Sequence, residues 1–149
     1  MPRMLDLARK ALSGEIEVPG LPPPVAKLIG FTLTEVAPGR AVIEFEAAER
    51  HANPMGTLHG GILCDIADAA MGMAYASTLE EGETFTTVEL KINFLRPVRT
   101  GRLRAVGHVV QRGHTVGLVE CDVTDDNDRK VARATSTCMT LRGEQAQGR

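Results

Sequence analysis

The chain has 149 residues, of which 43% are apolar and 24% charged, a composition typical of one globular domain with its own core. Seventeen basic and nineteen acidic residues leave a formal net charge of −2, which argues against a nucleic-acid-binding domain because such domains are usually basic. With no tryptophan, one tyrosine and four phenylalanines, the core must consist mostly of aliphatic side chains.

The two ends of the chain are expected to lie outside the main domain. Met1 to Leu12 has the pattern of a short amphipathic helix that ends at Ser13-Gly14. Val18 to Pro24 contains four prolines and is expected to be irregular, because proline fixes its own backbone and donates no hydrogen bond. Residues 142–149 are polar and expected to be flexible. The sequence therefore divides into an N-terminal segment, 1–24, one domain, 25–141, and a tail.

The domain combines one long helix with a series of strands. The helix is expected over about His59 to Thr78, where apolar residues occur on almost every side, as in a core helix. Alternation and turn residues predict six strands, over Phe31–Ala37, Ala41–Ala47, Thr86–Leu95, Leu103–Val110, Thr115–Thr124 and Val131–Leu141. Short turns make consecutive strands antiparallel. We therefore expect an α+β fold in which a curved antiparallel sheet of about six strands wraps around one central helix.

The strand predicted over Thr86 to Leu95 alternates between two faces. Apolar side chains occupy one face, at Val88, Leu90, Ile92 and Phe94, and polar ones the other, at Thr87, Glu89, Lys91 and Asn93. This strand is a candidate for an edge of the sheet. Because proteins rarely leave a long strand edge bare, a symmetric dimer that continues the sheet is a natural way to cover it.

Small and acidic residues form one stripe along the predicted helix. Spacings of four, three and four residues place its members on one face, at Gly61, Asp65, Asp68 and Gly72. An aspartate in an apolar helix costs desolvation free energy unless it is paired or used in chemistry. A structural role for Asp65 or Asp68, capping a strand or pairing with an arginine, competes with a role in contacting a polar ligand.

The loop before this helix ends in two consecutive glycines, Gly60 and Gly61. The first N–H groups of a helix have no partner within it, and the helix dipole adds partial positive charge. Glycines allow a ligand to approach these donors closely, so the loop could hold an anion or the oxyanion formed when a carbonyl is attacked. A glycine-rich turn that only reverses the chain is an equally good interpretation of the loop alone.

Other classes of site and location have little support. Three widely spaced cysteines without a C-x-x-C pair indicate reduced core residues instead of a disulfide scaffold or zinc site. His51 and His59 lack the spacing of metal ligands, so no metal is expected. The stretch from Ile62 to Ala76 is too short for a membrane span and contains two aspartates, and no signal peptide is apparent. A cytoplasmic protein without membrane contact is therefore expected.

The motif Asn53-x-x-Gly56-x-x-His59-Gly60-Gly61, followed by Asp68, resembles the hotdog-fold acyl-CoA thioesterases of the phenylacetate (PaaI-like) and hydroxybenzoyl-CoA type. The resemblance continues through Thr87, through 93–97 and to Gly113, and covers roughly residues 31–141. It implies a homodimer or homotetramer that hydrolyses an acyl-CoA thioester without a metal or organic cofactor, coenzyme A being part of the substrate.

The resemblance also implies catalytic roles for five residues. Gly60 would offer its backbone N–H to the thioester carbonyl, and Asp68 from the facing subunit would be the catalytic base or nucleophile. Asn53 would help to place the attacking water or the carboxylate, and His59 would orient the loop and the thioester. Thr87 matches a hydroxyl with which some members hold water or the acid.

Substrate-binding residues are expected beside these. Gly61 and Asp65 share the stripe with Asp68, although Asp65 falls on no catalytic position of the family and is interpreted as a local structural acid. Arg96 and Arg99 belong to an arginine cluster suited to the phosphates of coenzyme A, while scattered solvated charge explains any one of them equally well. His114 stands where the family commonly has a basic residue.

Several functional alternatives remain open on sequence alone. A non-catalytic acyl-CoA sensor on the same fold usually carries an output module, and the N-terminal extension here is short and not notably basic. A hotdog hydratase is expected to have an aspartate and a histidine close together, whereas no aspartate lies between His51 and His59. A purely structural oligomeriser leaves the glycine pair and Asp68 unexplained. Both aryl and medium-chain acyl groups are possible substrates.

Overall fold

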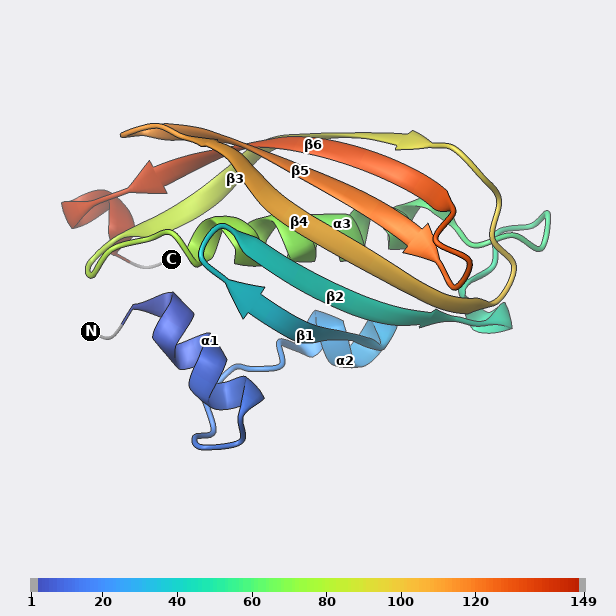
Figure 1. Ribbon diagram of the computed structural model, residues 1–149, viewed down its shortest axis with the longest axis horizontal. Helices are drawn as coiled ribbons and strands as arrows, with labels where there is room; N and C mark the ends of the chain where they lie inside the picture. Colours follow the sequence, from blue (N-terminus) through green and yellow to red (C-terminus); the bar gives the residue numbers. More distant parts are fainter. Residues whose placement is uncertain (1–2, 148–149) are drawn as a thin grey trace.

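The computed structural model describes residues 3–147 and contains one six-stranded antiparallel sheet that arches over a central helix (Figure 1). Its strand order is β1-β2-β4-β5-β6-β3. The strands span Phe31–Ala37 (β1), Arg40–Ala47 (β2), Thr84–Phe94 (β3), Gly101–Arg112 (β4), Val116–Asp125 (β5) and Lys130–Leu141 (β6). The α+β fold, the six strands and their antiparallel pairing confirm the sequence prediction.

The central helix, α3 (Gly60–Ala76), lies against the sheet and supplies much of the core. Ile66, Ala70 and Ala74 are fully buried, and they pack with apolar residues of β2, β4 and β5. At Gly107 of β4 the helix approaches so closely that a Cβ atom would lie 2.4 Å from the Ala70 carbonyl oxygen. Glycine is therefore required there, because any larger residue would push α3 away from the sheet.

The strand β3 forms one edge of the sheet and contains a β-bulge. It pairs only with β6 in the described chain, and the register shifts between Thr87 and Glu89. Because a bulge inserts one residue, it changes which positions face the helix. Phe85 before the bulge and Leu90 and Ile92 after it all pack on the core. The edge position agrees with the prediction, but the unbroken alternation was wrong: the bulge leaves Val88 58% exposed.

The N-terminal segment, taken from here on as residues 3–29, contains two short helices beside β1. Both lie on the side of the sheet that carries α3 (Figure 1). The first, α1 (Met4–Leu12), agrees with the predicted amphipathic helix; the prediction for Met1 and Pro2 lies outside the described residues. The second, α2 (Pro24–Ile29), was not predicted. Pro24 is its first residue, where a missing N–H costs nothing because that group has no helical acceptor.

The C-terminal residues are tied to the turn before β3 by ion pairs. Glu83 accepts from Arg142 at 2.6 Å and from Arg112 at 3.1 Å, and a 3-10 helix follows at Gly143–Ala146. Burial raises the pKa of Glu83, but the N–H of Glu80 and the two guanidinium groups outweigh it and leave that pKa lowered. This network stabilises the end of the sheet at which α3 ends.

Candidate active site

Backbone donors are exposed where α3 begins. His59 precedes the helix, and its Nδ1 accepts the Gly61 N–H at 3.0 Å, which satisfies one of the unpaired donors of the first turn. Within residues 3–147, no acceptor binds the N–H of Gly60. The hydrogen bond from Gly61 uses Nδ1 as an acceptor, which leaves Nε2 as the ring nitrogen able to donate to a ligand. His59 and Gly60, both predicted as site residues, therefore lie together at the start of α3, and the N–H of Gly60 is free to donate.

The ring of Phe94 explains why residue 60 has no side chain. A Cβ atom on Gly60 would lie 2.8 Å from Phe94 Cζ, well inside normal carbon contact. Phe94 is 56% exposed at the end of β3, so its ring covers the start of α3 from the edge of the sheet. Sequence reasoning missed this contact, because two residues so far apart in the chain carry no joint local signal.

Asn53 holds the loop before α3 in shape. Its Oδ1 accepts from the N–H groups of Met55 and Thr57, at 3.0 and 3.2 Å. Its Nδ2 donates to Thr57 Oγ1 at 2.9 Å. Arg99 donates to the Gly56 carbonyl at 3.2 Å and fastens the same loop from outside. In the single chain, Asn53 is thus an organiser of the loop that presents His59 and Gly60.

His51, considered in the sequence as a metal ligand, is a buried structural residue. Its Nδ1 accepts from the Ala48 N–H at 3.1 Å, and its Nε2 lies 3.1 Å from the Ile29 carbonyl oxygen. The ring also packs on Phe45 at a centroid distance of 4.8 Å. Both ring nitrogens are occupied, and no metal-binding group of His, Cys, Asp or Glu occurs among residues 3–147.

Asp68 and Thr87 meet between α3 and β3. Thr87 Oγ1 donates to Asp68 Oδ1 at 3.4 Å, and the bulge after Thr87 is what places this hydroxyl on the helix side of the strand. The Asp68 side chain is exposed in the single chain, so protein atoms enclose it only in part. Burial raises the pKa of Asp68, the hydrogen bond from Thr87 opposes that rise, and the charge of Asp65 adds to it. Such a carboxylate is a stronger base than an ordinary aspartate.

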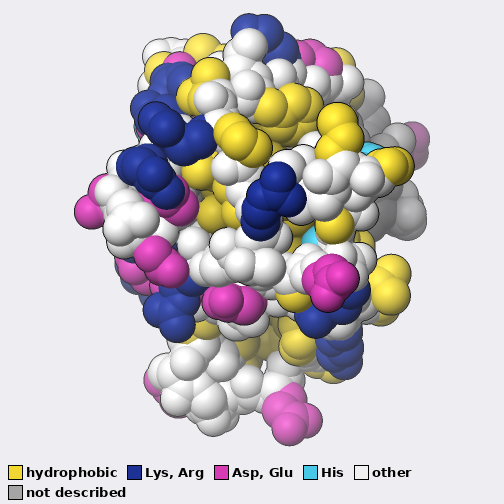
Figure 2. Space-filling view, turned by 90° about the vertical axis from the view of Figure 1, so that its right-hand side faces the viewer, with side chains coloured by type: hydrophobic (Ala, Val, Ile, Leu, Met, Phe, Trp, Pro, Cys, Tyr) yellow, Lys and Arg dark blue, Asp and Glu magenta, His cyan; other side chains and the backbone are white. Residues whose placement is uncertain are grey.

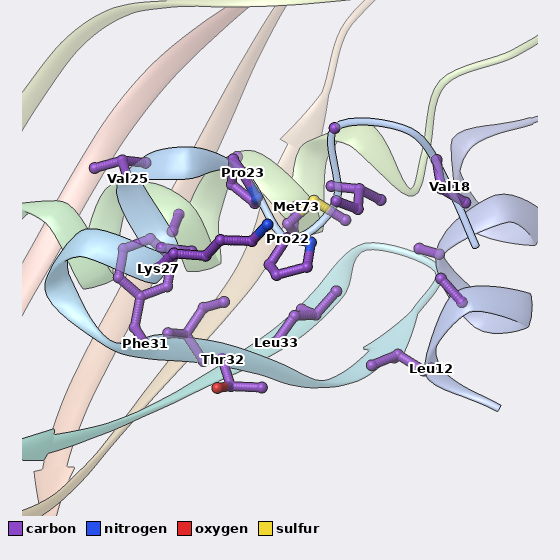
Figure 3. A pocket seen from close by; sticks show the side chains of 18 of the residues that line it. Leu12, Val18, Pro22, Pro23, Val25, Lys27, Phe31, Thr32, Leu33 and Met73 are labelled. Atoms are coloured by element: carbon purple, nitrogen blue, oxygen red, sulfur yellow. The ribbon is translucent and has the colours of Figure 1, made fainter. Parts of the chain in front are cut away.

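A large groove opens beside this carboxylate. Its volume is about 1270 Å³, and Asp65, Asp68 and Thr87 line one part of it together with Gly72 and Phe85. Asp65 is half-buried, and burial raises its pKa. The opposite wall comes from β1 and from the N-terminal segment, whose labelled side chains in Figure 3 surround the space. Three members of the predicted stripe, Asp65, Asp68 and Gly72, thus line a cavity, whereas Gly61 does not.

The predicted binding residues lie at two ends of the sheet. Arg96 and Arg99 are exposed before β4 begins, whereas His114 is exposed in the turn after β4 ends, about 40 Å away along that strand. Figure 2 shows Lys and Arg side chains spread over the loop end of the molecule, with apolar side chains between them. Within one chain, His114 therefore cannot share a ligand group with Arg96 or Arg99.

The cysteines differ in their surroundings. Cys121 and Cys138 are buried as predicted, and burial raises the pKa of Cys121 to about 12. Cys64 is only half-buried, on the helix, but burial and the nearby charges of Asp65 and Asp68 raise the pKa of its thiol as well. None of the three is activated as a thiolate.

No helix among the described residues has the length and apolar character needed to cross a membrane.

A curved antiparallel sheet around a central helix, with a free backbone donor at the start of that helix and a carboxylate at a groove, is the architecture expected of a hotdog-fold thioester hydrolase. The sequence profile of the thioesterase superfamily matches residues 55–132. The chain belongs to this superfamily, in the branch of PaaI-like acyl-CoA thioesterases that its motif resembles.

Individual relatives cover most of the chain. Acyl-coenzyme A thioesterase 13 of Mus musculus is 28% identical over 132 residues, which are 88% of this chain and 91% of that protein. The crystal structure of a phenylacetic acid degradation-related protein from Ralstonia eutropha JMP134 is 33% identical, with a TM-score of 0.75, and covers 88% of this chain and 97% of its own. A mutant of the phenylacetic acid degradation protein PaaI from Thermus thermophilus is 25% identical, with a TM-score of 0.74 and shares of 79% and 97%.

Proposed function

We propose that the protein hydrolyses an aryl- or medium-chain acyl-CoA to the free acid and coenzyme A, with Asp68 as base or nucleophile. The observation that carries the proposal is the Asp68 carboxylate, held by Thr87 and lining an open groove with a raised pKa. A thioester has a good leaving group, so polarising its carbonyl and supplying a carboxylate or an activated water is sufficient chemistry. The reaction requires no metal or organic cofactor.

The free N–H of Gly60 is the proposed oxyanion donor. A negative charge that develops on the thioester oxygen is stabilised by an unpaired backbone donor and by the positive end of the helix dipole. His59 supports this position, because its cap on the Gly61 N–H fixes the first turn of α3. The Asn53 hydrogen bonds support the loop in turn.

Two copies of the chain are needed to complete this site. Gly60 and Asp68 lie on one helix, about 12 Å apart along its axis, so they cannot both contact one thioester carbonyl. We place the second copy at the free edge of β3, where Val88, Phe94 and Leu95 are exposed. A dimer that continues the sheet there covers these side chains and carries the Gly60 of one subunit toward the Asp68 of the other.

Arg96 and Arg99 are the proposed contacts for the phosphates of coenzyme A, since Arg99 donates to the Gly56 carbonyl in the loop that presents Gly60 and Arg96 is exposed three residues earlier. His114 reaches the same ligand only if a further subunit brings its turn there, as in a tetramer. The unpaired cysteines and an acyl-CoA substrate fit a cytoplasmic location.

The experiment compares wild type, Asp68→Asn and Asp65→Asn on a panel of acyl-CoA esters, with coenzyme A release followed by chromatography. Asp68→Asn keeps the shape of the side chain and is expected to lower kcat by about 10²- to 10⁴-fold. Asp65→Asn makes the same chemical change one turn earlier in the same groove, and we expect it to act on KM with kcat within about threefold. Equal losses of kcat in both variants, or full activity in Asp68→Asn, would contradict the assigned role.

A further inference from the structure

The groove at Asp68 is lined mainly by apolar residues from a part of the chain that the catalytic roles leave unused. Leu12, Ile16, Val18 and Leu21 from the N-terminal segment line it, and Val25 of α2 follows. Figure 3 labels three of them, Leu12, Val18 and Val25, among the side chains that line the space between β1 and Met73 of α3. Leu21 is 37% exposed and lines the groove, so it is not a core residue.

The N-terminal segment is held against the domain almost entirely by apolar contacts. Every backbone hydrogen bond from an N–H of residues 6–28 in the described chain has its acceptor within the same segment. The polar links to the domain from residues 3–29 include the ion pair between Arg3 and Glu80 and the contact of the Ile29 carbonyl with His51. Ala8 and Ala26 are buried and anchor the two short helices. The segment thus forms a separate wall laid over the groove.

The size of the groove and the chemistry of its lining suit an extended aliphatic acyl chain better than an aromatic ring. About 1270 Å³ exceeds the 300–1,000 Å³ of common small-molecule pockets and is far more than one phenyl group fills. The aromatic residues of the lining are Phe31 and Phe85, and most of the other side chains are aliphatic. The proposed catalytic carboxylate, Asp68, lines the groove with other residues of α3 and β3, and the apolar wall of the same groove extends to residues of α1.

We infer that residues 8–25 form the distal part of an acyl-binding groove and that they select aliphatic acyl chains of medium or greater length over aryl groups. This inference rests on the proposed function, because it takes the thioester carbonyl to lie at Asp68. Residues such as Leu21 are then specificity-determining: they contact the far end of a long chain and leave a short acyl group untouched. Each methylene that enters the groove strengthens binding by about fourfold.

The test uses the full-length protein and CoA esters of butanoate, octanoate, dodecanoate and phenylacetate. The variant Leu21→Ser changes the groove wall, and Leu28→Ser is the matched control, because Leu28 is 83% exposed on α2 and does not line the groove. We expect kcat/KM of wild type to rise from butanoyl- to dodecanoyl-CoA. Leu21→Ser should lower the value for dodecanoyl-CoA by about tenfold and leave that for butanoyl-CoA within about twofold. Leu28→Ser should leave both unchanged.

Binding separates this inference from the proposed function. Calorimetric titration of dodecanoyl-CoA and free coenzyme A into Asp68→Asn, with and without Leu21→Ser, measures the acyl contribution without turnover. If wild type hydrolyses no ester, the proposed function fails, while weaker dodecanoyl-CoA binding caused by Leu21→Ser still supports the groove. If phenylacetyl-CoA is the best substrate, or if Leu21→Ser affects all chain lengths equally or none, the inference is overturned and a second copy of the chain is the occupant to examine.

Discussion

The substitution Gly60→Ala separates two reasons for a glycine at the start of α3. The added Cβ atom would lie 2.8 Å from Phe94 Cζ and 3.1 and 3.2 Å from the two neighbouring ring carbons. Carbon atoms in proteins prefer separations of about 3.5–4.0 Å, so the ring and the helix start must move apart by roughly 0.7–1.2 Å. Phe94 is exposed in the single chain but covered in the proposed dimer, so the start of α3 must give way as well as the ring.

Stability and activity should therefore respond differently to this change. Alanine is a better helix former than glycine by up to about 1 kcal/mol, which offsets most of the lost ring contact. We expect the melting temperature to stay within about 4 °C of wild type. A shift of up to about 1 Å at the proposed oxyanion donor can cost about 10²-fold in rate, so kcat should fall by 10- to 100-fold in the thioesterase assay.

Two further variants complete the comparison. Gly72→Ala makes the same change on the same helix, where the new Cβ atom would lie 3.4 Å from Phe85, a distance that requires little adjustment. It should be at least as stable as wild type. Adding Phe94→Leu to Gly60→Ala removes the clash and should restore much of kcat. If Gly60→Ala keeps full activity, the Phe94 ring yields without moving the N–H of residue 60, and the predicted displacement of the oxyanion donor is refuted.

The remaining predictions concern two carboxylates and the free edge of β3. Burial raises the pKa of Asp68 from its ordinary 3.8, and the carboxylate is the active form. The midpoint of the acid limb of the pH–rate profile should therefore lie above pH 3.8, and a midpoint at or below that value contradicts the assignment. Glu83→Gln weakens two ion pairs and should lower the unfolding free energy by about 1–2 kcal/mol at pH 7. The pKa of Glu83 is lowered on folding, so its carboxylate stabilises the fold above the pKa of the unfolded state. This stabilisation disappears as the pH falls through the pKa of the folded state, and thermal melts of wild type and Glu83→Gln at pH 7 and pH 3 measure the loss. Val88→Lys should shift a dimer toward monomer in sedimentation equilibrium and reduce kcat, whereas Val110→Lys, an exposed valine of β4, should do neither.

The fold could be predicted from sequence because local patterns carry most of it. Alternation and turn residues placed β1 at its observed bounds, and the all-round apolar pattern identified α3 as a core helix. The bulge in β3 left no such signal, because Val88 continues a regular alternation with Leu90 in the sequence. Its cause is three-dimensional: Phe85 and Leu90, of opposite parity, both pack against the core. The short helix α2 was hidden by the prolines that precede it.

The candidate site was predictable in its residues but not in its shape. The spacing of the loop motif and Asp68 singled out Gly60, His59 and Asp68, and the structure places the first two together where the helix begins. The groove was not predictable, because its apolar wall comes from a proline-rich segment that has neither helical nor strand periodicity. Contacts between distant segments, such as Phe94 with Gly60, depend on the fold and appear only once it is known.

The bulge also links the architecture of the sheet to the chemistry. In a strand without it, Thr87 and Leu90 would face opposite sides, so either the hydroxyl would point away from Asp68 or Leu90 and Ile92 would leave the core. One inserted residue satisfies both requirements and turns Val88 outward at the free edge. The same irregularity thus positions the partner of the proposed catalytic carboxylate and exposes an apolar side chain at the edge where we place the second subunit, so assembly and catalysis should be lost together when β3 is altered at this point.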